Sequence, residues 1–248
     1  MLLEGKVAVI TGATRGIGKA IAEEFARQGA LLILNGTNEA LLQKLKEEIS
    51  KINTNSHLVI GDISDPKTTE KLIGKAMDLY HQVDILVNNA GIITRESTEK
   101  MSLVDWDRVL NVNLNGTLYI CKKIIPIMKK QKSGKIINIS SRAAKHPKLN
   151  TSPSYGASKA GMIYLTRHFA LELGPFGVNV NAVCPGPIET AMAKRWSDNY
   201  RRKVLANIPL RRLGKPEEVA QTVLFLASNL SNFITGETIN INGGMSMD

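Results

Sequence analysis

The stretch SPSYGASKAG, residues 152–161, places a phenol at Tyr155 and an ammonium at Lys159, four positions apart among small side chains. On a helix, this spacing puts both groups on one face, within reach of each other or of one bound ligand. A free tyrosine titrates at about pH 10, and a lysine ammonium about 4 Å away at an effective dielectric of about 20 favours the phenolate by about 4 kcal/mol. The pair is typical of a proton donor with a lowered pKa, and a core tyrosine beside a surface lysine is the alternative for an isolated Y-x-x-x-K.

Polar residues in two further segments support a catalytic interpretation of this pair. The run GKIINISS ends in Ser140 and Ser141, and a hydroxyl there can donate to a carbonyl oxygen while Tyr155 protonates it. Asn113 lies in the middle of an apolar helical pattern, where an amide competes with backbone hydrogen bonds unless something needs it. A structural asparagine with satisfied hydrogen bonds is the alternative there. Together these residues predict proton transfer to a carbonyl group.

A glycine-rich segment, TGATRGIG, follows the first apolar run, with Gly12, Gly16 and Gly18 in the spacing G-x-x-x-G-x-G. Glycine lets the backbone turn tightly and approach a phosphate, while the unpaired N–H groups of a helix start donate to its oxygens. A tight packing joint is the alternative. The position between a strand and a helix favours dinucleotide binding.

The end of the second apolar run bears on which dinucleotide binds. NAD enzymes commonly hold an acidic residue there for the ribose 2′-OH. Here the run ends in Gly36, Thr37 and Asn38, with no acid before Glu39. The lack of a carboxylate, together with Arg15 in the glycine loop, favours NADP over NAD, with a mere surface arginine as the alternative for Arg15.

Seven short β-branched runs, separated by segments of helical period, must position these groups: KVAVITG, ALLILNG, SHLVIGD, DILVNNAG, GKIINISS, VNVNAVCPG and ETININGG. They predict an α/β fold, a doubly wound parallel sheet of about seven strands with helices on both faces. With no linker or break in composition, residues 1–248 are expected to form a single domain. Residues 187–215, basic and interrupted by Pro209 and Gly214, are interpreted as a substrate lid, with a surface excursion as the alternative.

Composition and charge narrow the class of protein. No apolar run approaches the roughly 18 residues of a membrane span, and the first residues lack a signal-peptide pattern. Cys121 and Cys184 lack metal or redox spacing, so we expect a cytoplasmic protein with reduced thiols and no metal. The net charge of +10 leaves a solvated surface, an acidic substrate or an acidic carrier open. Nucleic acid is disfavoured because no binding motif accompanies the charge.

Over nearly the whole chain, the order and spacing of several motifs resemble the short-chain dehydrogenase/reductase family. These motifs are TGATRGIG, NNAG, YGASK, PGPIET and NGG, together with Asn113 and Ser141. The resemblance implies a Rossmann-type NAD(P) oxidoreductase, usually a homotetramer. Tyr155 is then the general acid/base, and Lys159 binds the nicotinamide ribose and lowers the pKa of the tyrosine. Ser141 orients and polarises the carbonyl, while Asn113 holds the water of a proton relay.

The same resemblance implies cofactor contacts along one edge of the sheet. The loop contacts on the pyrophosphate side are Gly12, Thr14, Arg15, Gly16, Ile17 and Gly18, with Arg15 and Thr37 facing the 2′-phosphate of NADP(H). Adenine borders Asp62 and Ile63, the adenosine ribose borders Asn89, Ala90 and Gly91, and the nicotinamide carboxamide borders Pro185, Gly186, Ile188 and Thr190. Asn88 is expected to tie neighbouring strands together.

Within the family the pattern is closest to the bacterial 3-oxoacyl-[acyl-carrier-protein] reductases, on motifs such as VNVNAVCPGPIETAM and IPLRRLGKPEEVAQTVLFLAS. This implies NADPH-dependent reduction of a 3-oxoacyl thioester in fatty acid biosynthesis, with the acidic acyl carrier protein as a partner. The loop RAAKHPKLNTSPS departs from the small apolar loop of that group and carries Lys145, His146 and Lys148. Reduction of a sugar, polyol, steroid or small ketone is therefore an alternative, as is a non-catalytic nucleotide-sensing protein.

Overall fold

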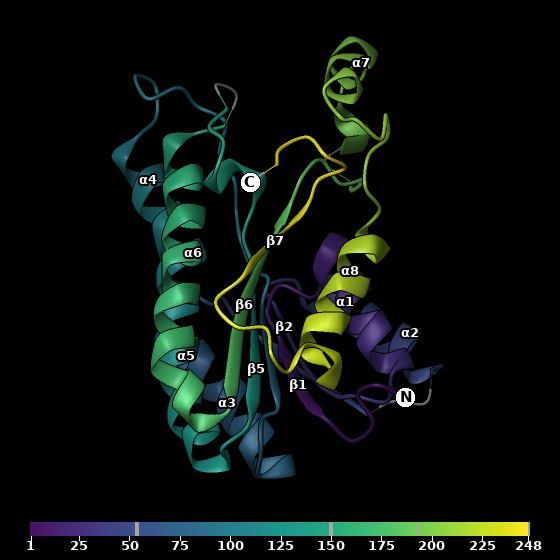
Figure 1. The fold of residues 1–248 in the computed structure, drawn as a ribbon, viewed down its shortest axis with the longest axis vertical. Coiled ribbons are helices and arrows are strands. Elements are labelled where there is room, and N and C mark those ends of the chain that lie inside the picture. The colour runs from purple at the N-terminus through teal and green to yellow at the C-terminus, as the bar shows by residue number, and fades with distance from the viewer. Residues whose placement is uncertain (53–54, 149–150, 192, 248) are drawn as a thin grey trace.

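The seven predicted apolar runs form one parallel sheet in the computed structural model, which describes residues 1–52, 55–148, 151–191 and 193–247. The strands are β1 (Val7–Ile10), β2 (Leu31–Gly36), β3 (Ser56–Ile60), β4 (Ile85–Asn88), β5 (Gly134–Ile139), β6 (Val178–Pro185) and β7 (Thr238–Ile241). Their order in the sheet is β3-β2-β1-β4-β5-β6-β7. The predicted doubly wound fold is confirmed (Figure 1).

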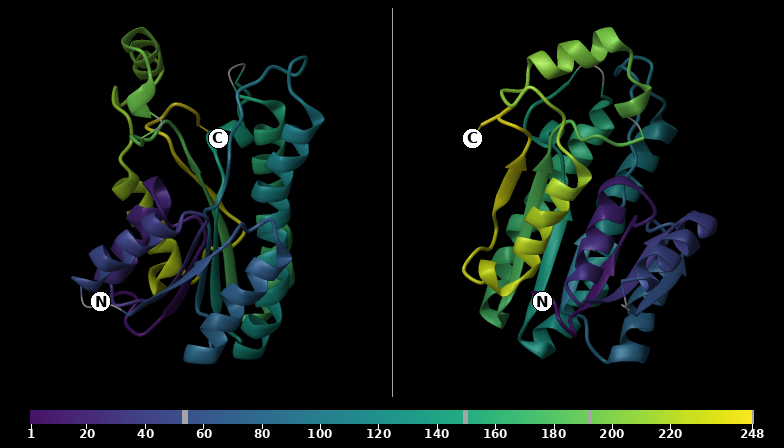
Figure 2. Two further views of the ribbon diagram at one scale, coloured as in Figure 1. Left: turned by 180° about the vertical axis from the view of Figure 1, so that it is seen from behind. Right: turned by 90° about the vertical axis from the view of Figure 1, so that its right-hand side faces the viewer.

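Two helical layers cover the faces of the sheet (Figure 2). One layer contains α1 (Gly16–Arg27), α2 (Glu39–Ser50) and α8 (Pro216–Ala227). The other contains α3 (Pro66–Tyr80), α4 (Leu103–Leu110), α5 (Gly116–Gln131) and α6 (Pro153–Leu173). Short helical turns are the π-helical η1 (Asn111–Asn115) and the 3-10 turns η2 (Arg142–Ala144), η3 (Gly174–Phe176), η4 (Ala193–Arg195) and η5 (Asn229–Ser231). Because both faces are covered, most residues of the strands are apolar.

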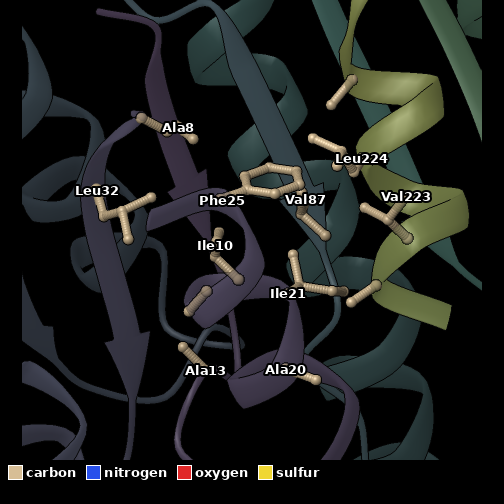
Figure 3. Packing of buried hydrophobic residues seen from close by; sticks show 14 of the residues in the cluster. Ala8, Ile10, Ala13, Ala20, Ile21, Phe25, Leu32, Val87, Val223 and Leu224 are labelled. Carbon is tan, nitrogen blue, oxygen red and sulfur yellow. The ribbon is translucent and has the colours of Figure 1, made fainter. Parts of the chain in front are cut away.

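The layer of α1, α2 and α8 shows how the sequence pattern becomes packing. The apolar side chains of α1 recur on one helical face, which is buried, with Ile21 and Phe25 both at 0% exposure. Figure 3 shows these two side chains between Ile10 of β1 and the α8 residues Val223 and Leu224. Burying each of these large side chains stabilises the fold by about 2 kcal/mol. This packing fixes the start of α1, and with it the glycine loop, against the sheet.

The carboxyl ends of the strands meet at one edge, and the sheet order reverses between β1 and β4. Ligands of doubly wound sheets bind in the crevice at such a point. Asn88 at the end of β4 donates to the side chain of Asn138 on β5 at 2.8 Å, and Asn138 donates to Thr166 of α6 at 2.8 Å. The predicted structural role of Asn88 in tying strands together is confirmed.

The segment 187–215 leaves this edge and returns to it. A parallel bridge between Ile188 and Gly214 closes its base, and its helix α7 (Asp198–Ala206) stands beyond the carboxyl ends of the strands (Figure 1). A small apolar cluster built on Ala193, Ile208 and Leu213 holds the segment together. Residue 192 of the predicted lid lies outside the described residues.

Other sequence expectations concern membranes and metals. Within residues 1–52, 55–148, 151–191 and 193–247, no helix has the length and apolar character needed to span a bilayer. The same described residues contain no group of three His, Cys, Asp or Glu side chains suited to a metal ion. Cys121 and Cys184 are free and buried, and burial raises the pKa of the Cys121 thiol to about 12.

Candidate active site

Tyr155 lies in the first turns of α6, at the wall of a cavity of about 300 Å³ beyond the ends of β5 and β6. The helix begins at Pro153, directly after Ser152, whose hydroxyl contacts that of Thr94 at 2.6 Å. Burial raises the pKa of Tyr155, and a hydrogen bond with the Ser141 side chain opposes this shift. The phenol is therefore protonated at neutral pH.

Lys159 is placed one helical turn after Tyr155 and is 3% exposed. Its Nζ donates to the backbone oxygen of Ile139 at 2.7 Å, and burial lowers its pKa to about 8. The pKa of Tyr155 is raised overall, with burial as the largest cause, and the lowering of this pKa by Lys159 stays a prediction. Lys159 lines the same cavity as Tyr155.

The two serines after β5 have different surroundings. Ser140 is buried, and its hydroxyl donates to the backbone oxygen of Lys159 at 2.9 Å. Ser141 is partly exposed in the cavity, accepts from the backbone N–H of Ala143 at 3.1 Å, and lies near enough to Tyr155 to oppose the rise in the pKa of that residue. The geometry therefore leaves Ser141, as predicted, as the serine able to reach a ligand beside Tyr155.

Asn113 occupies the π-helical turn η1 and is 0% exposed. Its Oδ1 accepts from the backbone N–H of Ile92 at 2.8 Å, and its Nδ2 donates to the oxygen of Ile92 at 3.0 Å and to Ser158 Oγ at 3.0 Å. The side chain thus joins the loop after β4 to α6, beneath Lys159. These three bonds agree with the alternative of a structural asparagine, while the water of a proton relay at Asn113 stays a prediction.

The glycine loop is shaped for close approach to a ligand. Gly12 has φ +64, and a Cβ there would lie 2.7 Å from Ala90 Cα. Asn89 Nδ2 donates to the backbone oxygens of Thr11 at 3.0 Å and Gly12 at 2.9 Å, clamping the loop to the end of β4. Only glycine fits this turn without strain, so the loop leaves a cradle open to the start of α1.

A second cavity, of about 350 Å³, lies over this cradle, and its lining includes Gly12 of the tight turn and Arg15, a cation suited to phosphate. Of the predicted cofactor residues it is lined by Gly12, Thr14, Arg15, Ile17, Thr37, Asp62, Ile63, Asn89, Ala90, Gly91 and Thr190. The neighbouring cavity, which holds Tyr155 and Lys159, is lined by Pro185, Gly186 and Ile188. The residues that line both cavities include Ile17, Asn89, Gly91 and Thr190. Gly16 and Gly18 support the loop but are not among the lining residues of either cavity.

Sequence reasoning missed part of this second cavity. Arg108 of α4 lines the second cavity together with Arg15 of the glycine loop, although the two arginines are far apart in the sequence. Glu39 does not line this cavity. Arg108 stands on an amphipathic helix with no motif around it, so its helical face offered no signal of a ligand. Two arginines and one carboxylate, Asp62, are the charged groups among the described lining residues.

The cavity that holds Tyr155 also receives side chains that the sequence did not place there. Trp196, Tyr200 and Val204 come from the segment 187–215, and the Trp196 and Tyr200 rings meet edge to face at 5.1 Å. Arg95, Arg142 and Lys148 line it from two loops. Lys148 belongs to the loop expected to influence substrate choice, whereas Lys145 and His146 are not lining residues, and residues 149–150 lie outside the described part of the chain.

Comparison with known proteins agrees with this geometry. Residues 12–246 match the family model described as enoyl-(acyl carrier protein) reductase. A 3-oxoacyl-[acyl-carrier-protein] reductase from Aquifex aeolicus is 43% identical, covering 98% of both chains. A 3-oxoacyl-[acyl-carrier protein] reductase from Brucella melitensis with bound NAD is 33% identical, with a TM-score of 0.93 over 100% of this chain and 93% of that one. A presumed gluconate dehydrogenase from Agrobacterium tumefaciens is 32% identical, with a TM-score of 0.94 over 98% of this chain and 96% of that one.

The model match over most of the chain and the identity to full-length relatives establish the family. The non-catalytic alternative falls with this result, because the matched proteins are reductases. The chain belongs to the short-chain dehydrogenase/reductase family of nicotinamide-dependent oxidoreductases.

Proposed function

We propose that the protein uses NADPH to reduce the carbonyl of a 3-oxoacyl thioester, forming the 3-hydroxyacyl thioester. The observation that carries the proposal is that Ser141, Tyr155 and Lys159 line one cavity, which adjoins the dinucleotide cradle. The Aquifex aeolicus relative, named for this activity, matches over 98% of both chains and supports the choice of substrate.

A bound reduced nicotinamide supplies hydride to the carbonyl carbon. The substrate carbonyl oxygen lies between the hydroxyls of Ser141 and Tyr155, which donate hydrogen bonds to it and stabilise the negative charge that develops there. Tyr155 then transfers its proton to that oxygen, which completes the alcohol. The raised pKa of Tyr155 suits this direction, because the residue must begin the reaction as a neutral phenol.

Lys159 and Asn113 complete the proposed catalytic group. Lys159, buried beside Tyr155, binds the nicotinamide ribose and returns a proton toward the phenol after turnover. Asn113 positions the loop after β4 and α6 through its bonds to Ile92 and Ser158, and water held near this turn would link Lys159 to solvent. π-helical turns such as η1 occur frequently at functional sites.

The choice of NADPH over NADH rests on the adenosine end of the second cavity. Thr37 lines it where NAD enzymes commonly carry an acid, and Arg15 and Arg108 supply cations for a 2′-phosphate. The bound NAD in the Brucella melitensis relative shows that a similar fold also accepts the dinucleotide without that phosphate. The preference for NADPH over NADH is therefore measured by kinetics with both cofactors.

The remaining parts of the proposal concern partners. The net charge of +10 suits an acidic acyl carrier protein, and the segment 187–215 acts as a lid because Trp196, Tyr200 and Val204 cover the cavity. A homotetramer is proposed from the family resemblance. Reduction of a keto derivative of a sugar acid is a second candidate function, favoured by three cations in the cavity and by the gluconate dehydrogenase relative.

Steady-state kinetics with a substrate panel test these assignments. The panel contains acetoacetyl thioester, crotonyl thioester and 5-keto-gluconate, each with NADPH and NADH. The proposal predicts the highest kcat/KM for acetoacetyl thioester with NADPH. A higher value for 5-keto-gluconate selects the second candidate, and reduction of crotonyl thioester alone rejects both.

A further inference from the structure

Three cations line the substrate cavity beside Tyr155. Arg95 comes from the loop between β4 and α4, while Arg142 and Lys148 come from the segment between β5 and α6. Lys159 adds a fourth positive group, and the described residues that line the cavity include no aspartate or glutamate. The wall of the cavity is therefore strongly positive where Arg95, Arg142 and Lys148 line it.

The cations are close enough to affect one another. Burial, and after it the charges of Arg142 and Arg95, lower the pKa of Lys148 to about 8. Burial also lowers the pKa of Arg142. Since like charges gathered in a partly buried site repel one another, the arrangement is unfavourable unless a negative group joins it.

Two N–H donors in the same cavity point to a ligand independently of charge. Arg142 Nε and Trp196 Nε1 are buried, and neither has a hydrogen-bond partner among the described residues. Both residues line the cavity: Arg142 belongs to η2, and Trp196 belongs to the segment 187–215. Buried donors normally have a partner, so these two are suited to an acceptor that a ligand brings.

We propose that Arg142, Lys148 and Arg95 form an anion subsite, which selects substrates that carry a carboxylate or a phosphate. This inference rests on the proposed function, since it names the substrate class of the same site. A neutral acyl chain alone would leave Arg142 and Lys148 desolvated and without a counter-charge. The anion could be a carboxylate at the far end of the acyl chain or a phosphate of the thioester arm.

The test compares three thioesters with NADPH. Acetoacetyl-N-acetylcysteamine is neutral, 3-oxoadipyl-N-acetylcysteamine carries a terminal carboxylate, and acetoacetyl-CoA carries phosphates on its arm. The inference predicts that kcat/KM of the unmodified protein is about 10-fold or more higher for at least one anionic thioester than for the neutral one. The thioester that gains identifies the source of the anion.

Variants separate recognition from folding. Lys148→Met is expected to raise KM for the favoured anionic thioester by roughly 10-fold, with kcat and the neutral thioester changed by less than about 2-fold. Lys148→Arg should retain the preference. Lys194→Met, an exposed lysine on η4 outside the cavity lining, removes the same charge and should leave all three thioesters unchanged.

Two results overturn the inference while the proposed function stands: equal use of neutral and anionic thioesters by the unmodified protein, or an equal loss with all three in Lys148→Met. If no thioester is reduced but 5-keto-gluconate is, the proposed 3-oxoacyl activity fails. In that case, a raised KM for this carboxylate in Lys148→Met still supports the anion subsite, and an unchanged KM rejects it.

Discussion

Replacing Asn113 with alanine tests whether its side chain holds the site together. The substitution removes bonds of 2.8 and 3.0 Å to the backbone N–H and C=O of Ile92 and one of 3.0 Å to Ser158. Ser158 keeps its own bond to the oxygen of Tyr155, so the two backbone groups of Ile92 bear most of the loss. Each buried group left without a partner costs about 1–3 kcal/mol, which gives about 3 kcal/mol in total.

Urea unfolding at constant pH measures this loss. The free energy of unfolding should fall by about 3 kcal/mol, and the Tm should fall by about 10 °C for a chain of this size. Asn111→Ala is the matched control, since Asn111 lies exposed on the same turn and contacts Asn115; its effect should stay within about 0.5 kcal/mol. A loss below about 1 kcal/mol in Asn113→Ala would refute the reasoning, because the buried amide would then be dispensable.

Three further predictions concern pH and the cofactor. Burial lowers the pKa of Lys159 to about 8, so the ammonium is lost as pH rises through that value; kcat for carbonyl reduction should fall there, and a profile flat to about pH 9.5 contradicts this. Thr37→Asp should lower kcat/KM with NADPH by about 10-fold or more and spare NADH, while an equal loss with both cofactors disproves the assigned 2′-phosphate site. Gly12→Ala places a Cβ 2.7 Å from Ala90 Cα, so titration should show NADPH bound roughly 10-fold more weakly; unchanged affinity contradicts the cradle.

The fold was predictable because its periodic patterns are strong. Runs such as ALLILNG begin with five consecutive apolar residues, which a sheet covered on both faces accommodates, and β2 spans Leu31–Gly36 within that run. The stripe of Ile21 and Phe25 likewise predicted the buried face of α1. Side chains after strand ends, including Ser141 and Asn89, could be assigned to the site because parallel strands share one carboxyl edge.

Electrostatic behaviour was less accessible from sequence. The four-residue spacing placed Tyr155 and Lys159 at one cavity, but it did not reveal that Lys159 Nζ donates to Ile139 or that burial raises the pKa of Tyr155. Spacing along a helix specifies which side chains share a face, whereas a pKa depends on burial and on partners from other elements. The π-helical turn that directs Asn113 toward Ile92 was not predictable from the sequence either, because the bonds of Asn113 involve residues of other elements.

The substrate cavity depends on contacts between distant segments. Trp196 and Tyr200 enter it from the excursion after β6, and Arg95 enters it from the loop after β4. No local pattern marks these residues, because loops lack the periodicity that identifies helices and strands. Lys148 could be singled out from the sequence only because its loop differs from the corresponding loop of the related reductases.

The most direct test of the central claim is single-turnover reduction by Tyr155→Phe, alongside titration with NADPH. Phenylalanine keeps the ring that fills the site and removes only the hydroxyl that Ser141 contacts. The account predicts a rate of acetoacetyl thioester reduction lower by about 1000-fold, with the NADPH Kd unchanged within about 2-fold. A rate within about 10-fold of the unmodified protein would contradict it, because the proton would then come from another group.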